Sequence, residues 1–378
     1  MPPHPATPQT ARAINDRAAL ALFAARGALT AGQLQESTGL ARPTVTELLG
    51  RLGSAGLIEQ IGEIGADRRG PNARLYALAG RRACVAGIDA RTDIVYLAVI
   101  DLTGRAVAER AAAIPSGTPA AAALDTVTAA LAEAVRGGES GPLHSVSIGV
   151  PGLINPVSGR VRPVAAEAGW HAELAHAVRE RTGLDAAAVT LDNEVNLAGI
   201  AEHRVIGPRG SDSFGLLWLG TAGVGASLIL DGVLRRGASG GAGELGFLAV
   251  PGAGPQVGRT DCTGGLFDLV GPAAVARLAD AHGVAPDAFE HPAFRAELSA
   301  RIALGAAAFA LVVDPGLVVL GGELGRAGGA LLAAAVERRL AAVCPVPTSV
   351  RTTAVPGNPI LTGAVATALD RARAALWP

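Results

Sequence analysis

Acidic side chains occur at two turns of the sequence where they could contact a small polar ligand. Asp192, Asn193 and Glu194 follow the apolar run "AVTL" and precede the helix-like segment "VNLAGIAE". A carboxylate at the carboxyl end of a strand commonly faces the crevice in which an α/β protein binds its ligand. Glu244 stands in the glycine-rich sequence "GELG". We therefore expect Glu194 and Glu244 to accept hydrogen bonds from a ligand.

These residues also have structural interpretations. Asp192 and Asn193 could cap the helix that follows them, and for Asp192 capping and ligand contact are equally open. Glu244 could simply be solvated among its glycines. A further turn, "GVPG" (149–152), ends a strand with Pro-Gly, which is a place where backbone amides can meet a ligand hydroxyl.

The sequence "GIDARTD" (87–93) predicts a hairpin with polar side chains at its tip. Apolar runs at 83–88 and 94–100 predict its two strands. Glycine at such a tip lets the backbone approach a phosphate, but this tip carries Arg91, Thr92 and Asp93. A side chain there blocks the approach, and Asp93 would repel a phosphate.

Two later segments keep the small residues that this hairpin lacks. One is the loop with Gly220, Gly223 and Gly225, and the other is "LGGELG" (320–325). The family resemblance given below implies that both remain usable for a nucleotide, although glycine could serve those turns without any ligand.

The first 80 residues have the pattern of a winged helix-turn-helix. Apolar periodicity predicts helices at about 11–25, from Thr30, and at about 42–54, and Thr30 with Gln33 forms a capping box. Ala41 lacks the side-chain oxygen that usually caps a helix like the third. "LIEQIG" and "ARLYAL" then predict two strands joined by the polar loop "EIGADRRGPN".

The third predicted helix and the loop carry side chains suited to DNA. Short hydroxyls and arginine near a helix N-terminus suit phosphate and base-edge contacts in a major groove, and loop arginines suit backbone or minor groove. The predicted DNA-binding residues are Arg42, Pro43, Thr44, Thr46, Arg51, Arg68, Arg69 and Arg74. The alternative is a dimerisation or protein-binding module with solvated arginines. Helices, turn and wing in this order favour DNA.

Beyond Arg81 and Arg82 the chain alternates apolar strands with alanine-rich helices, which predicts an α/β fold. The alternation restarts near Phe214, as if one unit were used twice. The 378 residues carry a net charge of −1, and the sequence contains arginine but no lysine. No apolar run approaches the roughly 18 residues that span a bilayer, and the first ten residues lack a secretory pattern. The three cysteines form no CxxC pair, which favours a reducing cytoplasm.

Seven motifs, taken in order, resemble those of the ROK family of repressors, open reading frames and sugar kinases. They are "GIDARTD", "IGVPGLIN", "AGW", "LDNEVNLAGIAE", "LGTAGVGASLILDG", "GASGGAGELGF" and "VVLGGELG". The resemblance covers about residues 10–375. It implies a winged helix-turn-helix (11–80) followed by a two-lobed actin-like (ribonuclease H-like) sugar-kinase fold. The implied first lobe is 81–198 with the C-terminal helix 362–376, and the second lobe is 199–361, with a sugar cleft between them.

The resemblance also implies effector-binding residues. Glu194 stands where family kinases hold the aspartate that takes the sugar proton, and its extra methylene misplaces the carboxylate for catalysis. Phe247 replaces a family histidine that serves zinc and sugar. The implied sugar-binding residues are Glu167, Asn193, Glu194, Glu244, Phe247 and Asp268. Only Cys262 remains of the family's CxCGxxGC run, so we expect no zinc, and no cofactor is predicted.

Together these features predict a cytoplasmic, sugar-responsive DNA-binding transcriptional regulator, most simply a repressor, and not an enzyme. The expected partners are a double-stranded DNA operator and a sugar or sugar derivative. A homodimer or dimer of dimers is expected, and no membrane. The rival interpretation is an ATP-dependent sugar kinase with a DNA-binding head. A third is a constitutive DNA-binding protein with a vestigial cleft.

Overall fold

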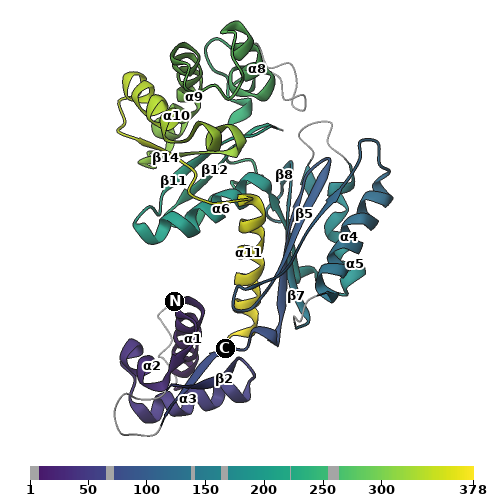
Figure 1. The fold of residues 1–378 in the computed structure, drawn as a ribbon, viewed down its shortest axis with the longest axis vertical. Coiled ribbons are helices and arrows are strands. Elements are labelled where there is room, and N and C mark those ends of the chain that lie inside the picture. The colour runs from purple at the N-terminus through teal and green to yellow at the C-terminus, as the bar shows by residue number, and fades with distance from the viewer. Residues whose placement is uncertain (1–7, 65–71, 138–140, 163–168, 222, 254–263) are drawn as a thin grey trace.

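The computed structural model describes residues 8–64, 72–137, 141–162, 169–221, 223–253 and 264–378. Figure 1 shows a small head beside the chain's N- and C-termini and two larger lobes, each built on its own sheet. The order of these parts along the chain is that of a helix-turn-helix followed by an actin-like pair of lobes, as the sequence predicts.

The head is a winged helix-turn-helix. Its elements are α1 (Pro8–Arg26), β1 (Leu29–Thr30), α2 (Ala31–Thr38), α3 (Arg42–Ser54), β2 (Ile58–Ile64) and β3 (Ala73–Leu78). The strands pair antiparallel in the order β1-β3-β2, and the helices bury Phe23, Leu34 and Leu48 between them. The capping box of Thr30 is present and Ala41 gives α3 no side-chain cap, so both expectations are confirmed. The two-residue β1 is an addition that periodicity could not reveal.

The first lobe is a five-stranded sheet with helices on both faces. Its strands are β4 (Cys84–Ala90), β5 (Ile94–Asp101), β6 (Ala106–Ala113), β7 (Leu143–Val150) and β10 (Val189–Asn193), in the order β10-β7-β4-β5-β6. Alternate residues of β4 face opposite ways, because Ile88 joins the core under α4 (Ala120–Arg136) and α5 (Leu174–Thr182). Val85 instead joins the core under α11 (Pro359–Leu376). The short ribbon β8 (Leu153–Ile154) and β9 (Val161–Arg162) follows β7.

The second lobe repeats this plan. Its strands are β11 (Phe214–Leu219), β12 (Val224–Leu230), β13 (Val233–Leu234), β14 (Leu317–Gly321) and β15 (Ser349–Thr352), in the order β13-β12-β11-β14-β15. In each sheet an antiparallel meander is followed by two parallel strands. The expectation that one unit is used twice is therefore confirmed.

Helices of the second lobe enclose its sheet. One core contains residues of α7 (Phe267–Val270), α8 (Pro272–Ala281), α9 (Pro292–Val313) and α10 (Gly322–Val343). The opposite core contains residues of α6 (Glu194–Ile206). Helix α6 therefore covers the other face of this sheet, and it contacts α11 extensively (Figure 1).

Helix α9 meets the length and composition of a membrane span, which the search for apolar runs in the sequence missed. Its Phe294, Leu298 and Ile302 are fully buried in the core of the second lobe. We therefore interpret α9 as a core helix, because these apolar residues already have protein neighbours.

Candidate functional site

The predicted DNA-contacting side of α3 is exposed. Val45, Leu48, Leu49 and Leu52 of α3 are buried against the head, whereas Arg42, Pro43 and Thr46 are exposed and Thr44 is half-buried. Thr46 Oγ1 donates to the Arg42 carbonyl oxygen at 3.0 Å. Arg74 is exposed on β3, opposite Glu63 of β2. Arg68 and Arg69 lie outside the described residues.

Arg51 differs from the other predicted DNA-binding residues because its guanidinium already has partners within the head. Its Nη2 donates to Asp16 Oδ1 at 2.7 Å, and its Nη1 donates to Glu47 Oε1 at 2.9 Å. Asp16 is buried, and its hydrogen bond raises the pKa of Arg51. The pair fixes α3 against α1, which gives Arg51 a structural role, and its predicted DNA contact stays a prediction.

Asn193 and Glu194 lie together where β10 passes into α6. Asn193 Oδ1 accepts the N–H groups of Val195 at 2.9 Å and Asn196 at 3.3 Å, which caps the helix. Its Nδ2 donates to Glu194 Oε2 at 2.8 Å and to the Gly152 carbonyl at 3.1 Å. The capping interpretation of Asn193 is thus confirmed, and the same side chain orients the Glu194 carboxylate.

Asp192 has internal partners on both carboxylate oxygens. Its Oδ1 accepts the Asn193 N–H at 2.9 Å and Asn196 Nδ2 at 3.0 Å. Its Oδ2 accepts Arg236 Nε at 3.0 Å and Nη2 at 2.5 Å. Because Arg236 follows β13 in the second lobe, the ion pair between the partly exposed Arg236 and the buried Asp192 joins the two lobes beside Glu194.

Glu244 lies in a glycine-rich loop that packs on β8. An added Cβ at Gly240 would lie 2.0 Å from the Ile154 carbonyl oxygen, and φ there is +87°, so the close approach requires glycine. An added Cβ at Gly241 would lie 3.8 Å from Leu153 Cδ2 and 3.9 Å from Glu244 Cγ. Glu244 therefore borders β8, whose preceding residue Gly152 accepts from Asn193. Burial raises the pKa of the Glu244 carboxyl.

The remaining predicted sugar-binding residues lie around this loop or outside the description. Phe247 ends the short helix η5 (Leu245–Phe247) and is half-buried, and its N–H donates to the Glu244 carbonyl at 3.2 Å. Asp268 is half-buried in the first turn of α7. The neighbouring Phe267 ring lies 3.6 Å from an added Cβ at Gly223, so an apolar side chain adjoins the second glycine loop. Glu167 lies outside the described residues.

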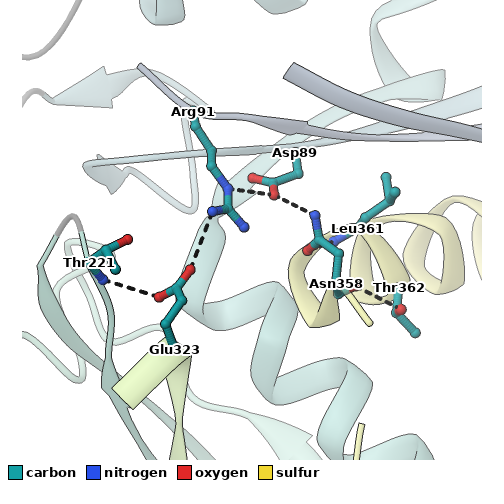
Figure 2. A network of polar contacts seen from close by, with 7 residues as sticks. All are labelled: Asp89, Arg91, Thr221, Glu323, Asn358, Leu361 and Thr362. Carbon is teal, nitrogen blue, oxygen red and sulfur yellow. Dashed lines mark hydrogen bonds and ion pairs between the residues drawn. The ribbon is translucent and has the colours of Figure 1, made fainter. Parts of the chain in front are cut away.

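Arg91, at the tip of the β4–β5 hairpin, connects the two lobes (Figure 2). Its Nε donates to Asp89 Oδ2 at 3.0 Å, and its Nη1 donates to Glu323 Oε1 at 3.4 Å. Glu323 Oε2 accepts the Thr221 N–H at 3.1 Å. Asp89 also accepts from Asn358 Nδ2 at 2.8 Å. We call these five residues, Asp89, Arg91, Thr221, Glu323 and Asn358, the interlobe bridge.

The charges of the interlobe bridge depend on one another. Burial raises the pKa of the Asp89 carboxyl, and Arg91 and Asn358 oppose this. Burial also disfavours the charged form of Arg91, but Asp89, Glu323 and Tyr96 together outweigh this effect and the pKa of Arg91 rises. Arg91 therefore stays a cation. Its guanidinium carbon lies 5.3 Å from the centroid of the Tyr96 ring, a further contact that suits a cation.

One donor of the second glycine loop, the Thr221 N–H, already has a protein carboxylate as its acceptor. This contact weighs against the expectation that the loop remains usable for a phosphate, which stays a prediction. Gly322 begins α10 with φ +75°, and an added Cβ would lie 2.4 Å from the Leu219 carbonyl oxygen. This tight turn brings Glu323 to the Thr221 N–H. The acid comes from "LGGELG", the other segment that was expected to serve a nucleotide.

Sequence reasoning missed four residues of the site. Three of them, Asp89, Glu323 and Asn358, belong to the interlobe bridge, and the fourth, Arg236, pairs with Asp192. A signal existed for one of them: an arginine at the end of a buried strand needs a carboxylate nearby, and Asp89 lies two residues before Arg91. No local pattern identifies Arg236, Glu323 or Asn358, because each partner is distant in sequence.

Metal-ligating side chains do not gather within the described part of the chain. No group of three or more His, Cys, Asp or Glu residues lies close enough there to hold an ion. Cys84 and Cys344 are buried, and Cys262 lies outside the described residues.

Two regions of the sequence match known families. Residues 85–371 match the ROK family, and residues 18–62 match the IclR helix-turn-helix domain. A putative xylose repressor of Caldicellulosiruptor sp. (strain Rt8B.4) is 28% identical over 227 residues, which cover 59% of this chain and 55% of that one. A glucokinase of Halalkalibacterium halodurans is 30% identical over 217 residues, 50% of this chain and 64% of that one. The chain thus spans between about half and two thirds of the length of these relatives.

Solved structures share the fold over longer spans. A ROK family transcriptional regulator, described as a homologue of the E. coli MLC protein, has a TM-score of 0.71 and 17% identity. That likeness covers 96% of this chain and 97% of the regulator. The ROK hexokinase from Thermus thermophilus has a TM-score of 0.62 and 25% identity over 77% of this chain and 99% of its own.

Proposed function

Because this chain belongs to the ROK family, we propose that it is a sugar-responsive DNA-binding regulator, most simply a repressor, whose cleft does not transfer phosphate. The observation that carries the proposal is the combination of a helix-turn-helix head with an interlobe bridge that fills both phosphate-binding turns. A head of this kind supports DNA binding, and the filled turns argue against a kinase.

The surface of the head supports contact with double-stranded DNA. Arg42, Thr44 and Thr46 lie on the outer side of the first turns of α3, and Arg74 lies on the wing. Arginine can bind base edges or phosphates, and hydroxyls can donate to phosphate oxygens. A homodimer would present two such heads, which predicts half-sites about one helical turn, ~34 Å, or multiples of it apart.

The cleft supports recognition of a sugar or sugar derivative. Glu194 and Glu244 border β8 from opposite lobes, and Asn193 and Asp268 add further polar groups nearby. Carboxylates accept hydrogen bonds from hydroxyl groups, so several at one site suit a polyol. One relative is named a putative xylose repressor and another a glucokinase, and both names are consistent with a sugar as the effector.

Phosphoryl transfer depends on positioning and on stabilising the charge of the transferred group. In this chain Arg91 occupies the first turn and Glu323 accepts the N–H of the second. A triphosphate would meet the Glu323 carboxylate at the position where it needs a donor, and like charges repel. We propose that the cytoplasmic protein binds sugar without turning it over, and that it requires neither metal, cofactor nor membrane.

The DNA-binding half of the proposal is tested by selecting binding sites from a pool of random double-stranded DNA. The double variant Arg42→Ala/Thr44→Ala should lose sequence-specific retention of the selected sites. Arg209→Ala removes an exposed arginine from the short 3-10 helix η4 (Gly207–Arg209), which lies outside the head, and serves as the matched control. Retention by the double variant at the wild-type affinity would contradict the assignment.

The effector half is tested by thermal shift against monosaccharides, amino sugars and sugar phosphates. A ligand at a hundred times its Kd stabilises the native state by about 2.7 kcal/mol, which is a rise of several degrees. Glu244→Gln should abolish the shift. Robust phosphorylation of any sugar in a coupled ATP assay would overturn the proposal in favour of a kinase. Silence across the panel, with DNA binding intact, would favour a constitutive DNA-binding protein.

A further inference from the structure

We propose that α11 transmits the relative position of the two lobes from the interlobe bridge to the DNA-binding head. The biological meaning of this inference rests on the proposed DNA-binding function. The contacts that carry it, and the test below, require neither DNA nor sugar. The helix has 18 residues, so its two ends lie about 27 Å apart.

The first end of α11 is part of the interlobe bridge. Asn358 caps the helix, because its Oδ1 accepts the Leu361 N–H at 3.1 Å, while its Nδ2 donates to Asp89 at 2.8 Å (Figure 2). Asp89 in turn holds Arg91, which reaches Glu323 in the second lobe. A change in lobe separation at Glu323 therefore acts on the group that fixes the start of α11.

The middle of α11 is held at backbone distance by its neighbours on both sides. An added Cβ at Gly87 of β4 would lie 2.6 Å from the Val365 backbone nitrogen. An added Cβ at Gly363 would lie 1.9 Å from the Leu197 carbonyl oxygen of α6. Ser145 Oγ also donates to the Ala368 carbonyl at 2.8 Å. Contacts this close leave little room for side chains to absorb a displacement, so the helix moves as a unit.

Helix α6 joins the same path from the proposed sugar site. It begins at Glu194, beside the cap Asn193, and near its other end Arg204 pairs with Asp370 of α11. A ligand that draws Glu194 and Glu244 together would thus act on α11 at a second point, closer to the head.

The far end of α11 is built into the head. Leu376 and Trp377 pack against the core that contains Leu20 and Phe23 of α1. Arg373 stacks 5.6 Å from the centroid of the Trp377 ring and donates to the Leu102 carbonyl at 2.9 Å. Arg17 of α1 donates to the Pro378 carbonyl. The head therefore has a direct mechanical connection to the helix whose start lies in the bridge, as Figure 1 shows for the course of α11.

The three tryptophans of the chain provide a reporter at each relevant place. Trp218 Nε1 lies 2.5 Å from an added Cβ at Gly220, so this ring adjoins the bridge. Trp377 lies at the head, and Trp170 is buried in the core of the first lobe. We would label the full chain with 5-fluorotryptophan, record its fluorine NMR spectrum, and assign each line with a single Trp→Phe variant.

Breaking the bridge with Arg91→Ala should shift the lines of Trp218 and Trp377 by more than their widths and leave Trp170 in place. The control is Arg301→Ala, which removes an ion pair with Glu297 on α9. Helix α9 packs in the core of the second lobe with α7, α8 and α10, so this variant should leave the Trp377 line in place. If Arg91→Ala fails to fold, Glu323→Gln weakens the same link with a side chain of the same shape.

A shift of Trp218 without a shift of Trp377 would overturn the proposal, and so would an unchanged pair of lines. The path is tested by repeating the experiment with Asn358→Ala, which removes the contact between α11 and Asp89. In that background Arg91→Ala should no longer move the Trp377 line. The effects of two substitutions add when the sites are independent, and they do not add when both lie on one path. A shift of undiminished size would show that the signal travels by another route. None of these outcomes depends on whether an operator or effector has been identified.

Discussion

The β4–β5 turn and the β11–β12 turn occupy the same place in two sheets of the same order, and they close with the same hydrogen bond. Arg91 N–H donates to the Ile94 carbonyl at 3.0 Å, and Gly220 N–H donates to the Gly223 carbonyl at 2.9 Å. Their side chains are opposite in kind. The first turn carries Arg91 as a cation, and the second offers a backbone donor, the Thr221 N–H, after Gly220.

Each of these turns supplies a group that could bind a phosphate, and each group is already used. Arg91 binds Asp89 and Glu323, while the Thr221 N–H binds Glu323. One carboxylate thus satisfies both turns at once. The comparison teaches that a duplicated hairpin can keep its backbone and change its purpose through a few side chains, here from holding a ligand to holding the other lobe.

The strongest test of this difference is to add a methyl group where the second lobe needs glycine. Gly322→Ala should lower the free energy of unfolding by about 3 kcal/mol, because it combines an unfavourable positive φ with a close backbone contact. Gly283→Ala is the matched control, since Gly283 also has positive φ but nothing within 4 Å of an added Cβ. Urea denaturation measures both, and equal losses in the two variants would contradict the packing argument.

Removing the cation from the first turn should have the next largest effect. Arg91→Ala leaves the buried Asp89 carboxylate without its ion pair, and we expect the free energy of unfolding to fall by about 2 kcal/mol. This is below the range for fully buried pairs, because Arg91 is 34% exposed. Adding Asp89→Asn should recover part of the loss. A double-mutant cycle by urea denaturation would refute the pairing if the two effects were simply additive.

Making the first turn resemble the second should create room for a nucleotide. The triple variant Arg91→Gly/Asp93→Thr/Glu323→Ala removes the blocking side chains and the competing carboxylate. We expect its affinity for Mg²⁺-ATP to exceed that of the wild type at least tenfold, about 1.4 kcal/mol, by isothermal titration calorimetry. Thermal unfolding serves as the control for folding. A folded variant with no gain would show that other features exclude the nucleotide.

The smallest effect concerns pH and compares the acids of the two lobes. Asp89 has a cation beside it, whereas burial alone raises the pKa of Glu244. Between the ordinary value of 4.5 and the raised one, the native state therefore binds more protons than the unfolded state, so stability falls as the pH rises. Glu244→Gln should make this fall smaller, and the raised pKa of Asp89 should leave a residual fall of the same sign. Urea denaturation from pH 5 to 8 would contradict the assignment if both proteins had the same slope.

The elements with local signals could be predicted from the sequence. Pro43 and the apolar stripe of α3 gave its bounds, and Thr30 with Gln33 gave the start of α2, because helix caps and amphipathic periods are contained within a few residues. The repeated strand pattern gave two lobes. Expectations for Arg68, Arg69 and Glu167 concern residues outside the description and remain predictions.

The partners that sequence reasoning could not identify depend on contacts across the fold. Arg51 looked free until α1 placed Asp16 beside it, and the second glycine loop looked open until α10 brought Glu323 to it. Arg91 and Glu323 are 232 positions apart. A side chain's type limits which partner it can accept, but only the packed fold decides which partner arrives.

The seating of Leu376 and Trp377 in the head has a consequence for the order in which the protein is made. The ribosome synthesises the head first, and such units often fold as they emerge. This head obtains two of its apolar neighbours, Leu376 and Trp377, only after both lobes have been translated. We therefore expect chains that end before α11 to carry an incompletely packed head, which would weaken the proposed DNA binding of such fragments.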